Sequence, residues 1–483
     1  MAYTDWYVTP ESDASDTNGG GSEGAPEYTI ASGGGNGCDS DGLGTTLTDN
    51  SGSDWSGVEA DDTICFDTAG VKELTVVTAV APGGDATKVT VSPAVTGGLN
   101  DKTANVNGAL ETVQRAADAI TKDHQNTDGD PVCVNVQYGT YNEAVAFDTN
   151  SGTYSGMITF RGYYNTIRDG CDSHTKRPTV GMFNNITQDY IVWEDFEVDA
   201  TGGGVMAIWH NGGTQGQFRH IKAAADAGQN VFYGDGGYTT LWRCEFTGGA
   251  VGISVGANRI SIHECYVTGS ATYGIHLGSS TYYHEVVDCI IDSPTDDCIY
   301  TRANYVTISG NVCYGSAGGS GLRINGGAPG FVLNNLLVGN NQYGLESSSP
   351  GYPWLYDHNY FYGNSQGNLD ANVTAGNADG GNNVVGTADP FADAANHDFT
   401  LKPGSTARRT GTPAAMPVGG TGYRDIGPLQ SSYSRVSLPA GAVLALGTTG
   451  ANGWDVDGVL TIEADAGSDD GEFELFLAAE EGS

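Results

Sequence analysis

The sequence predicts an all-β solenoid, in which short strands wind into a stack of coils. The first observation is an octet, Leu241 to Gly248, which returns at Ile262 to Gly269 and at Val286 to Ser293. The fourth residue of each copy forms a ladder along the chain: Phe196, Ile221, Cys244, Cys265, Cys289, Asn311, Asn335 and Asn359. Its members are 21 to 25 residues apart, and a period of this length with short β-like segments is typical of solenoids.

A second ladder supports the same fold. Apolar residues recur at the same spacing later in each repeat: Ile253, Ile275, Ile299, Leu322, Leu345 and Leu369. Each coil therefore contributes at least two apolar strands, whose inward side chains stack on the next coil about 4.8 Å away. The small polar residues of the first ladder suit tight turns, because Asn tolerates left-handed backbone geometry and its amide bonds to the backbone.

This pattern resembles the right-handed parallel β-helix superfamily (pectate-lyase-like), which contains pectate lyases, polygalacturonases and phage tailspikes. The resemblance covers residues 107–430. It implies a right-handed, single-stranded parallel β-helix and does not by itself imply an activity.

Four parts are expected along the chain. Residues 1–32 form a Gly/Ser/Asp-rich N-terminal segment, and residues 33–106 form a small inserted β-domain with several strand-like stretches. Residues 107–430 form the β-helix and residues 431–483 a small C-terminal β-module. A helix expected at 107–120 carries Leu110, Val113, Ala117 and Ile120 on one face. Such a helix would cap the open apolar end of the first coil.

The negative charge of the chain makes nucleic acids and anionic membranes unsuitable as partners. Asp and Glu total 58 against 20 Lys and Arg, for a net charge of −38. A surface this acidic repels DNA, RNA and anionic membranes. No apolar run is long enough to span a bilayer, and residues 1–6 lack the basic and apolar regions of a signal peptide. We therefore expect a protein of a virion or of an extracellular surface.

Cysteines and acidic loops raise the question of cofactors. Cys244, Cys265 and Cys289 lie on the first ladder and are expected to stack as buried thiols. No Cys or His spacing indicates zinc. Two acidic sets offer carboxylate oxygens to calcium: Asp13, Asp16 and Glu23, and Asp465, Asp469, Asp470 and Glu472. Solvated loops are the favoured explanation of both sets, so calcium stays open and no cofactor is assigned.

The register of the second ladder predicts a row of outward side chains. The residues that follow the inward Ile and Leu positions point outward. Four such residues are His276, Tyr300, Arg323 and Glu346, and Arg302 lies two residues after Tyr300 on the same strand. These five residues form the candidate ligand-binding set. Arg pairs carboxylates in a bidentate manner, which suits an anionic sugar. Further candidate sugar platforms are Trp209, Tyr233, Tyr238, Trp242, Tyr282 and Tyr283. The alternative is a solvated outer row with a few ion pairs.

One segment resembles a catalytic motif. Asp296–Asp297–Cys298 is similar to the Asp-Asp-Cys segment of polygalacturonases, and Arg323–Ile324–Asn325 is faintly similar to their Arg-Ile-Lys. The resemblance implies Asp296, Asp297 and Arg323 as catalytic residues if the protein is an enzyme. The upstream Asn-Thr-Asp of that family has no counterpart, and Gly319–Ser320–Gly321 lacks its histidine. An Asp-rich turn without catalysis is the alternative.

Two functions from different classes follow. The first is a structural or adhesive surface protein, such as a tailspike-like or decoration protein of a virion. It would be a homo-oligomer such as a trimer, in contact with other virion or surface proteins or with polysaccharide. The second is a polysaccharide lyase or glycoside hydrolase that acts on an acidic glycan. The incomplete catalytic set favours the first.

Overall fold

The computed structural model describes residues 177–326, 329–348, 354–376 and 378–408, together with shorter segments. Those segments are 4–8, 28–30, 38–50, 63–68, 71–82, 86–92, 104–106, 112–119, 132–147, 157–163, 413–415 and 421–423, with a few single positions. Contacts divide the chain into residues 1–429 and 430–483. The second unit, which holds the expected C-terminal β-module, lies outside the described residues.

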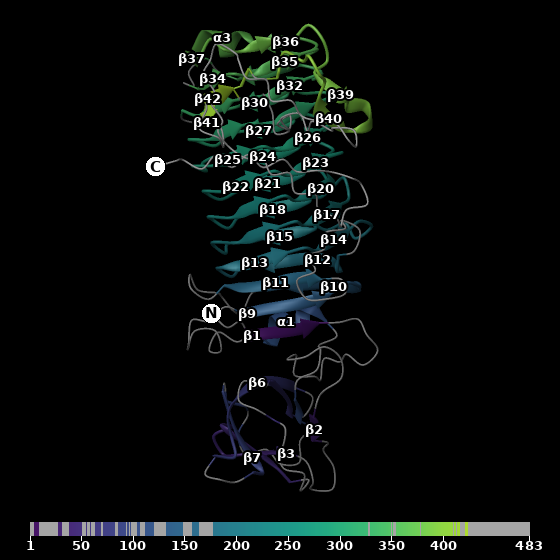
Figure 1. Ribbon diagram of the computed structural model, residues 1–483, viewed down its shortest axis with the longest axis vertical. Coiled ribbons are helices and arrows are strands. Elements are labelled where there is room, and N and C mark those ends of the chain that lie inside the picture. Colours follow the sequence, from purple (N-terminus) through teal and green to yellow (C-terminus); the bar gives the residue numbers. More distant parts are fainter. Residues whose placement is uncertain are drawn as a thin grey trace, which may run out of the picture. The chain divides into compact units, whose positions relative to one another are not determined.

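Each regular coil consists of three short strands. In one coil these are β19 (Thr240–Trp242), β20 (Glu245–Gly248) and β21 (Ile253–Val255). Each strand pairs in parallel with its equivalent one coil later, so Leu241 lies beside Ile262, Phe246 beside Val267 and Ile253 beside Ile275. Figure 1 shows these equivalent strands stacked in columns. The predicted parallel β-helix is confirmed.

The strands fall into three columns, named here in the order in which each coil visits them. The first column is a sheet of twelve strands: β1 (Thr4–Val8), β9 (Val132–Gln137), β11 (Ile158–Tyr163), β13 (Ile191–Glu194), β16 (Gln217–Arg219), β19, β22 (Ser261–His263), β25 (Glu285–Val287), β28 (Thr307–Ser309), β31 (Phe331–Leu333), β34 (Leu355–Asp357) and β37 (Ala378–Asp379).

The second and third columns alternate within one sheet of nineteen strands. The second column holds β10 (Thr140–Ala146), β12 (Thr179–Ile186), β14 (Glu197–Ala200), β17 (Lys222–Ala225), β20, β23 (Tyr266–Thr268), β26 (Ile290–Asp292), β29 (Val312–Tyr314), β32 (Leu336–Val338), β35 (Tyr360–Tyr362) and β38 (Val384–Val385). The third holds β15 (Ile208–His210), β18 (Phe232–Gly234), β21, β24 (Ile275–Leu277), β27 (Ile299–Thr301), β30 (Leu322–Ile324), β33 (Tyr343–Ser347) and β36 (Gly367–Leu369).

The first ladder lies at the bend between the first and second columns. Cys244, Cys265 and Cys289 are buried free thiols, as expected. Burial raises the pKa of the Cys265 thiol well above its ordinary value, so this sulfur stays protonated and unreactive. The cysteines of the ladder therefore serve as small core residues.

The asparagine part of this ladder corrects one expectation. The left-handed residue is not the ladder Asn but the residue before it, with φ of 61° at Asn334 and 53° at His358. The preceding residue makes the bend, which leaves the ladder side chain free to point inward and reach the next coil. Asn311 Nδ2 accordingly donates to the carbonyl of Val286 at 2.9 Å and to Asn335 Oδ1 at 2.9 Å.

The first coil has a helix and a strand that differ from expectation. Helix α1 (Val113–Ala119) is shorter than the expected 107–120. Its Val113 and Ala117 are buried in the main core, and the backbone amides of Val113 and Gln114 donate to the Glu143 carboxylate at 2.7 and 2.9 Å. The capping role of this helix stays a prediction. Strand β1, which the sequence did not predict, pairs in parallel with β9 at the start of the first column.

A separate antiparallel sheet precedes the coils in sequence. Its order is β2-β8-β5-β6-β7-β4-β3. The strands are β2 (Tyr28–Ile30), β3 (Cys38–Ser40), β4 (Thr46–Asp49), β5 (Thr63–Thr68), β6 (Val71–Val80), β7 (Lys88–Ser92) and β8 (Ala104–Val106). The sheet has its own core around Leu47, Trp55 and Ile64. Its first strand starts at Tyr28, a few residues before the expected boundary at 33.

Past β36, the chain folds back onto the outside of the second column. After helix α3 (Ala371–Gly376), strands β39 (Phe391–Asp393) and β40 (Asp398–Leu401) form a hairpin around the short helix η2 (Ala394–Asn396). Phe391 and Phe399 pack there against Val312, Leu336 and Tyr360. A short pair, β41 (Pro413–Ala415) and β42 (Thr421–Tyr423), follows. Among the described residues, no helix is long and apolar enough to cross a membrane.

Candidate functional site

The strand register places four of the predicted residues on consecutive coils of the third column. His276 on β24 pairs with Tyr300 on β27, Tyr300 with Arg323 on β30, and Arg323 with Glu346 on β33. Their preceding neighbours, such as Ile299, are fully buried. Because side chains alternate along a strand, the four point outward as one row. We name His276, Tyr300, Arg323 and Glu346 the outer row.

The same column continues toward the N-terminus with two more aromatic residues. Trp209 on β15 pairs with Tyr233 on β18, and Tyr233 pairs with Ser254, which pairs with His276. From the sequence, Trp209 and Tyr233 were predicted only as sugar platforms separate from the candidate ligand-binding set. Counting the register back from His276 by two coils for Tyr233 and by three for Trp209 would have placed them in line with the outer row.

An aromatic group occupies one end of the outer row. The rings of Tyr273 and Tyr300 stack with centroids 4.7 Å apart and planes 12° apart, and His276 lies 5.4 Å from Tyr300. Burial, followed by the charge of Arg302, lowers the pKa of His276. The imidazole is therefore neutral at neutral pH. The sequence did not predict Tyr273, which lies in the turn before β24.

Polar side chains hold Tyr300 from the side. Asn325 Nδ2 donates to the Tyr300 hydroxyl, and Ser348 Oγ donates to Asn325 Oδ1 at 2.8 Å. Each of these residues comes from a different coil. This network fixes the ring, so the aromatic surface is preorganised before any ligand arrives.

Arg323 is held by acceptors from the protein itself. Its Nη2 donates to Glu346 Oε1 at 2.8 Å and to Gln342 Oε1 at 3.2 Å, and its Nη1 lies 3.4 Å from Asp297 Oδ2. The positive charge is thus offset within the row. Arg302 is exposed just past the end of β27. The arrangement does not favour bidentate capture of a ligand carboxylate by Arg323.

Asp297 and Asp296 have different environments. The Asp297 side chain is fully buried, and its Oδ1 accepts the backbone N–H of Ser320 at 2.7 Å. Burial raises the pKa of Asp297 to about 7, although Arg323 acts in the opposite sense. Asp296 is half-buried, and a Cβ at Gly319 would lie 2.5 Å from its Oδ1. Gly319 is therefore required by this close approach. The structure brings Asp297 and Arg323 together, and the catalytic roles of Asp296, Asp297 and Arg323 stay a prediction.

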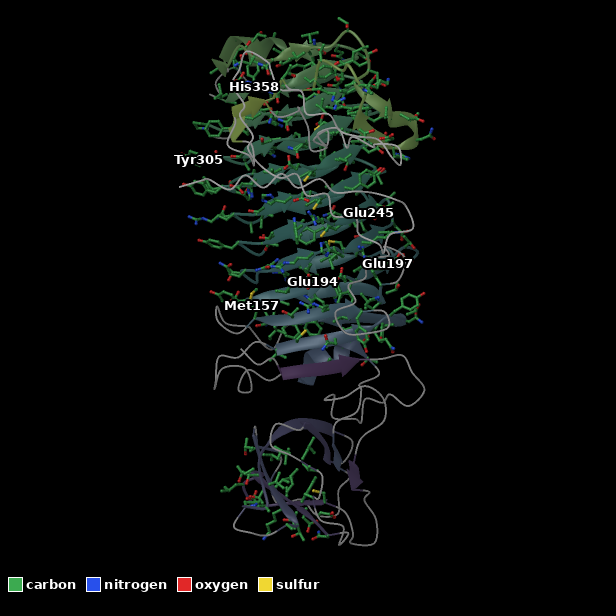
Figure 2. The ribbon with its side chains drawn as sticks, viewed as in Figure 1. Met157, Glu194, Glu197, Glu245, Tyr305 and His358 are labelled. Carbon is green, nitrogen blue, oxygen red and sulfur yellow. The ribbon has the colours of Figure 1, made fainter. Side chains whose placement is uncertain are left out.

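One group in the described part of the chain has the residue types of a metal site. Donor atoms of Glu194, Asp195 and His220 lie within 4.8 Å of one another. Figure 2 shows Glu194 at this position. Arg161 Nε donates to Glu194 Oε2 at 3.0 Å and competes for that carboxylate. The sequence did not predict the group, because its members come from two coils. Both acidic sets expected for calcium lie outside the described residues.

Comparisons with known proteins give one family match and several similar solved structures. Residues 206–365 match a family described as the right-handed beta helix region. A search of curated proteins finds no match. Among solved structures, the pectate lyase Pel9A is 13% identical over 66% of this chain and 91% of its own, with a TM-score of 0.41. An alginate lyase from Paenibacillus sp. str. FPU-7 is 15% identical over 51% of this chain and 94% of its own, with a TM-score of 0.41.

A phage protein is also similar. The Dettilon tailspike protein is 10% identical over 56% of this chain and 57% of its own, with a TM-score of 0.32. At these identities and scores, the similarities carry no inference about activity. The three-strand coils and their parallel register show that this chain has a parallel β-helix fold, and residues 206–365 match the right-handed beta helix region.

Proposed function

We propose that the protein is a structural and adhesive surface protein of a virion or another extracellular surface, which binds polysaccharide through the outer row. The observation that carries the proposal is the fixed aromatic group of Tyr273, His276 and Tyr300 on a rigid strand column. Aromatic rings beside amide and hydroxyl groups suit sugar rings, which present both apolar faces and hydroxyls.

The chemistry of the outer row supports binding rather than cleavage. A general acid or base must come within hydrogen-bond reach of the atom it serves. Asp297 is fully buried, and its oxygens face Ser320 and Arg323. The offset charge of Arg323 also makes the row suited to neutral sugars. Adhesion through such a row fits a surface protein that repeats the same coil many times.

A lyase or hydrolase is the second candidate, and one observation favours it. A carboxyl with a pKa of about 7, next to an arginine, is typical of functional sites. Incubation with a panel of neutral and uronic-acid polysaccharides distinguishes the two functions. New reducing ends or unsaturated products, lost in Asp297→Ala, would establish the enzyme and contradict the binding proposal.

Binding to the outer row is expected to depend on the ring of Tyr300. Tyr300→Ala removes the ring that stacks on Tyr273 and should weaken binding of the recognised polysaccharide about fivefold, since such aromatic contacts contribute about 1 kcal/mol. Tyr300→Phe keeps the ring and should change affinity less than about threefold. Isothermal titration against polysaccharides selected on a glycan array measures both.

The control for this experiment lies on another part of the chain. Tyr138, 43% exposed after β9, is a surface tyrosine far in sequence from the outer row. Tyr138→Ala should leave affinity unchanged. Equal losses in Tyr138→Ala and Tyr300→Ala, or no loss in Tyr300→Ala, would contradict the assignment of binding to the outer row.

A further inference from the structure

A second aromatic feature lies at the turn that leads from the third column back to the first. Tyr238, Arg259, Tyr283 and Tyr305 take equivalent places in this turn on four consecutive coils, and Tyr282 precedes Tyr283. The backbone amides of Tyr238, Arg259 and Tyr283 each donate to a carbonyl of the next coil at 2.9 to 3.1 Å. We name these five residues the tyrosine ridge. Figure 2 shows Tyr305 projecting away from the edge of the coils.

The side chains of the ridge form one continuous stack. The Arg259 guanidinium lies 5.0 Å from the Tyr238 ring centroid and 5.3 Å from that of Tyr283. The rings of Tyr283 and Tyr305 stack at 5.2 Å with planes 14° apart. The tyrosines are nevertheless exposed, with Tyr283 at 54% and Tyr305 and Tyr238 at 47%. Large apolar surface gathered in this way marks an interaction site rather than scattered surface residues.

The ridge uses side chains where glycine would be easier. Tyr238, Arg259, Tyr283 and Tyr305 all have φ between 55° and 64°. At the bend that follows the second column, the same left-handed conformation is taken mostly by glycine: Gly248, Gly269, Gly315, Gly339 and Gly363. A bulky residue in this conformation is strained. Large residues with positive φ also lie at the bend between the first and second columns, as at Arg243 and His358, so it is the exposed aromatic stack that sets the ridge apart.

Charge identifies the kind of partner. The four turns, at 235–239, 256–260, 278–284 and 302–306, contain two arginines and one acidic residue, Asp235, in a chain with 58 Asp and Glu. Arg259 forms no ion pair within the described residues. Arg243, by contrast, lies over Trp242 at 4.6 Å and also bonds to Glu264 at 2.7 Å. The ridge therefore presents a stacked guanidinium whose donors are available to a carboxylate from outside.

We propose that the tyrosine ridge is the surface through which two copies of this chain associate. The chain carries 58 Asp and Glu, and the four ridge turns contain one of them, so a carboxylate of the second copy can approach Arg259 there with little repulsion. Tyr and Arg are the residues that dominate binding energy in protein interfaces. The straight stack also repeats at the coil spacing, so a second copy meets the same chemistry along several coils.

The surface area of the ridge indicates how strongly two copies should associate. Four half-exposed tyrosines offer roughly 400 Å², about half of the ~800 Å² that each partner contributes to a standard interface. We therefore expect a reversible association that depends on protein concentration. The proposal does not depend on polysaccharide binding, because the ridge and the outer row share no residue.

Sedimentation velocity of the full chain tests the proposal, from about 1 to 100 μM. The wild-type chain should associate as concentration rises. Arg259→Glu and Tyr283→Asn should weaken association at least about tenfold; Asn is chosen because it tolerates the left-handed backbone. Arg243→Gln removes an equally stacked but paired arginine and should leave association unchanged, as should Tyr138→Asn. Circular dichroism confirms that each variant is folded.

Three results would overturn the proposal. The wild-type chain could stay monomeric throughout the range, or it could associate equally well in both ridge variants. Alternatively, the ridge variants could lose affinity for a polysaccharide while the wild type stays monomeric, which would assign the ridge to a glycan instead. Loss of polysaccharide binding in Tyr300→Ala alone, with association intact, would concern only the outer row.

Discussion

Replacing Asn335 with Ala should lower the free energy of unfolding by about 4 kcal/mol. Asn335 is fully buried at the bend of its coil. Its Oδ1 accepts the N–H and Nδ2 of Asn311 at 3.0 and 2.9 Å, and its Nδ2 donates to the Ile308 carbonyl and to Asn359 Oδ1, both at 3.0 Å. Ala removes all four bonds and leaves their partners buried without replacement, at about 1–3 kcal/mol each before relaxation.

Urea denaturation followed by circular dichroism measures this change. The matched control is Asn341→Ala, because the Asn341 side chain is exposed and lies only a few residues away. A surface substitution of this kind should change the free energy of unfolding by less than about 0.5 kcal/mol. Similar decreases in the free energy of unfolding in both variants would show that the buried Asn335 stabilises the fold no more than the exposed Asn341 does.

Acid should weaken the wild-type chain through His284 more than it weakens His284→Asn. His284 is buried, and burial lowers its pKa from 6.5 to about 4. The backbone N–H of Ile260 donates to Nδ1 at 3.3 Å, and Nε2 lies 2.8 Å from Thr281 Oγ1, which itself donates to the Gly278 carbonyl. Both ring nitrogens are therefore occupied in the neutral form, and protonation of Nδ1 breaks the bond from Ile260.

The lowered pKa of His284 determines whether acid raises or lowers the stability, and over which pH range it does so. Between pH 6.5 and about 4, the unfolded chain binds a proton at His284 that the folded chain does not. Stability contributed by the neutral ring is therefore full above pH 6.5 and is lost as the pH falls through the window, by about 3 kcal/mol in total. His210, also buried with a pKa of about 4, acts in the same sense. Asp297, with its raised pKa, acts in the opposite sense.

For this reason the test compares variants rather than the pH profile of the wild type alone. His284→Asn should be less stable than the wild type at pH 7.5, and this difference should shrink by about 3 kcal/mol when both are measured at pH 4. The control is His263→Asn, since His263 is a partly exposed histidine that faces Glu285. A constant difference between the wild type and His284→Asn at both pH values would contradict the role of burial.

The outer row shows how far the register of a solenoid extends from sequence to site. Side chains alternate along a strand, and parallel pairing repeats each position one coil later. Two ladders of inward residues were therefore enough to place His276, Tyr300, Arg323 and Glu346 side by side. Tyr273 escaped prediction because turns do not follow this alternation. The pairing of Arg323 with Asp297 was equally hidden, because it depends on where a buried turn directs its side chain.

The tyrosine ridge could not be predicted from the sequence in the same way. Tyr238, Tyr282 and Tyr283 were recognised as candidate platforms, yet nothing in their spacing indicated that Arg259 stacks between Tyr238 and Tyr283. The turns differ in length from coil to coil, so equivalent positions cannot be aligned by counting. Only the backbone hydrogen bonds between successive turns align these residues.

The sequence by itself determined the coil period, the inward ladders, the thiol and asparagine columns and the order of residues along the outer row. These features are readable in the sequence because apolar residues that recur at a fixed period are buried together when successive coils stack in register. The tertiary structure decided which residue makes each bend, that Arg323 is neutralised by Asp297 and Glu346, and that the chain after β36 folds back on the second column. These features depend on contacts between residues of different coils, whose partners no local pattern specifies.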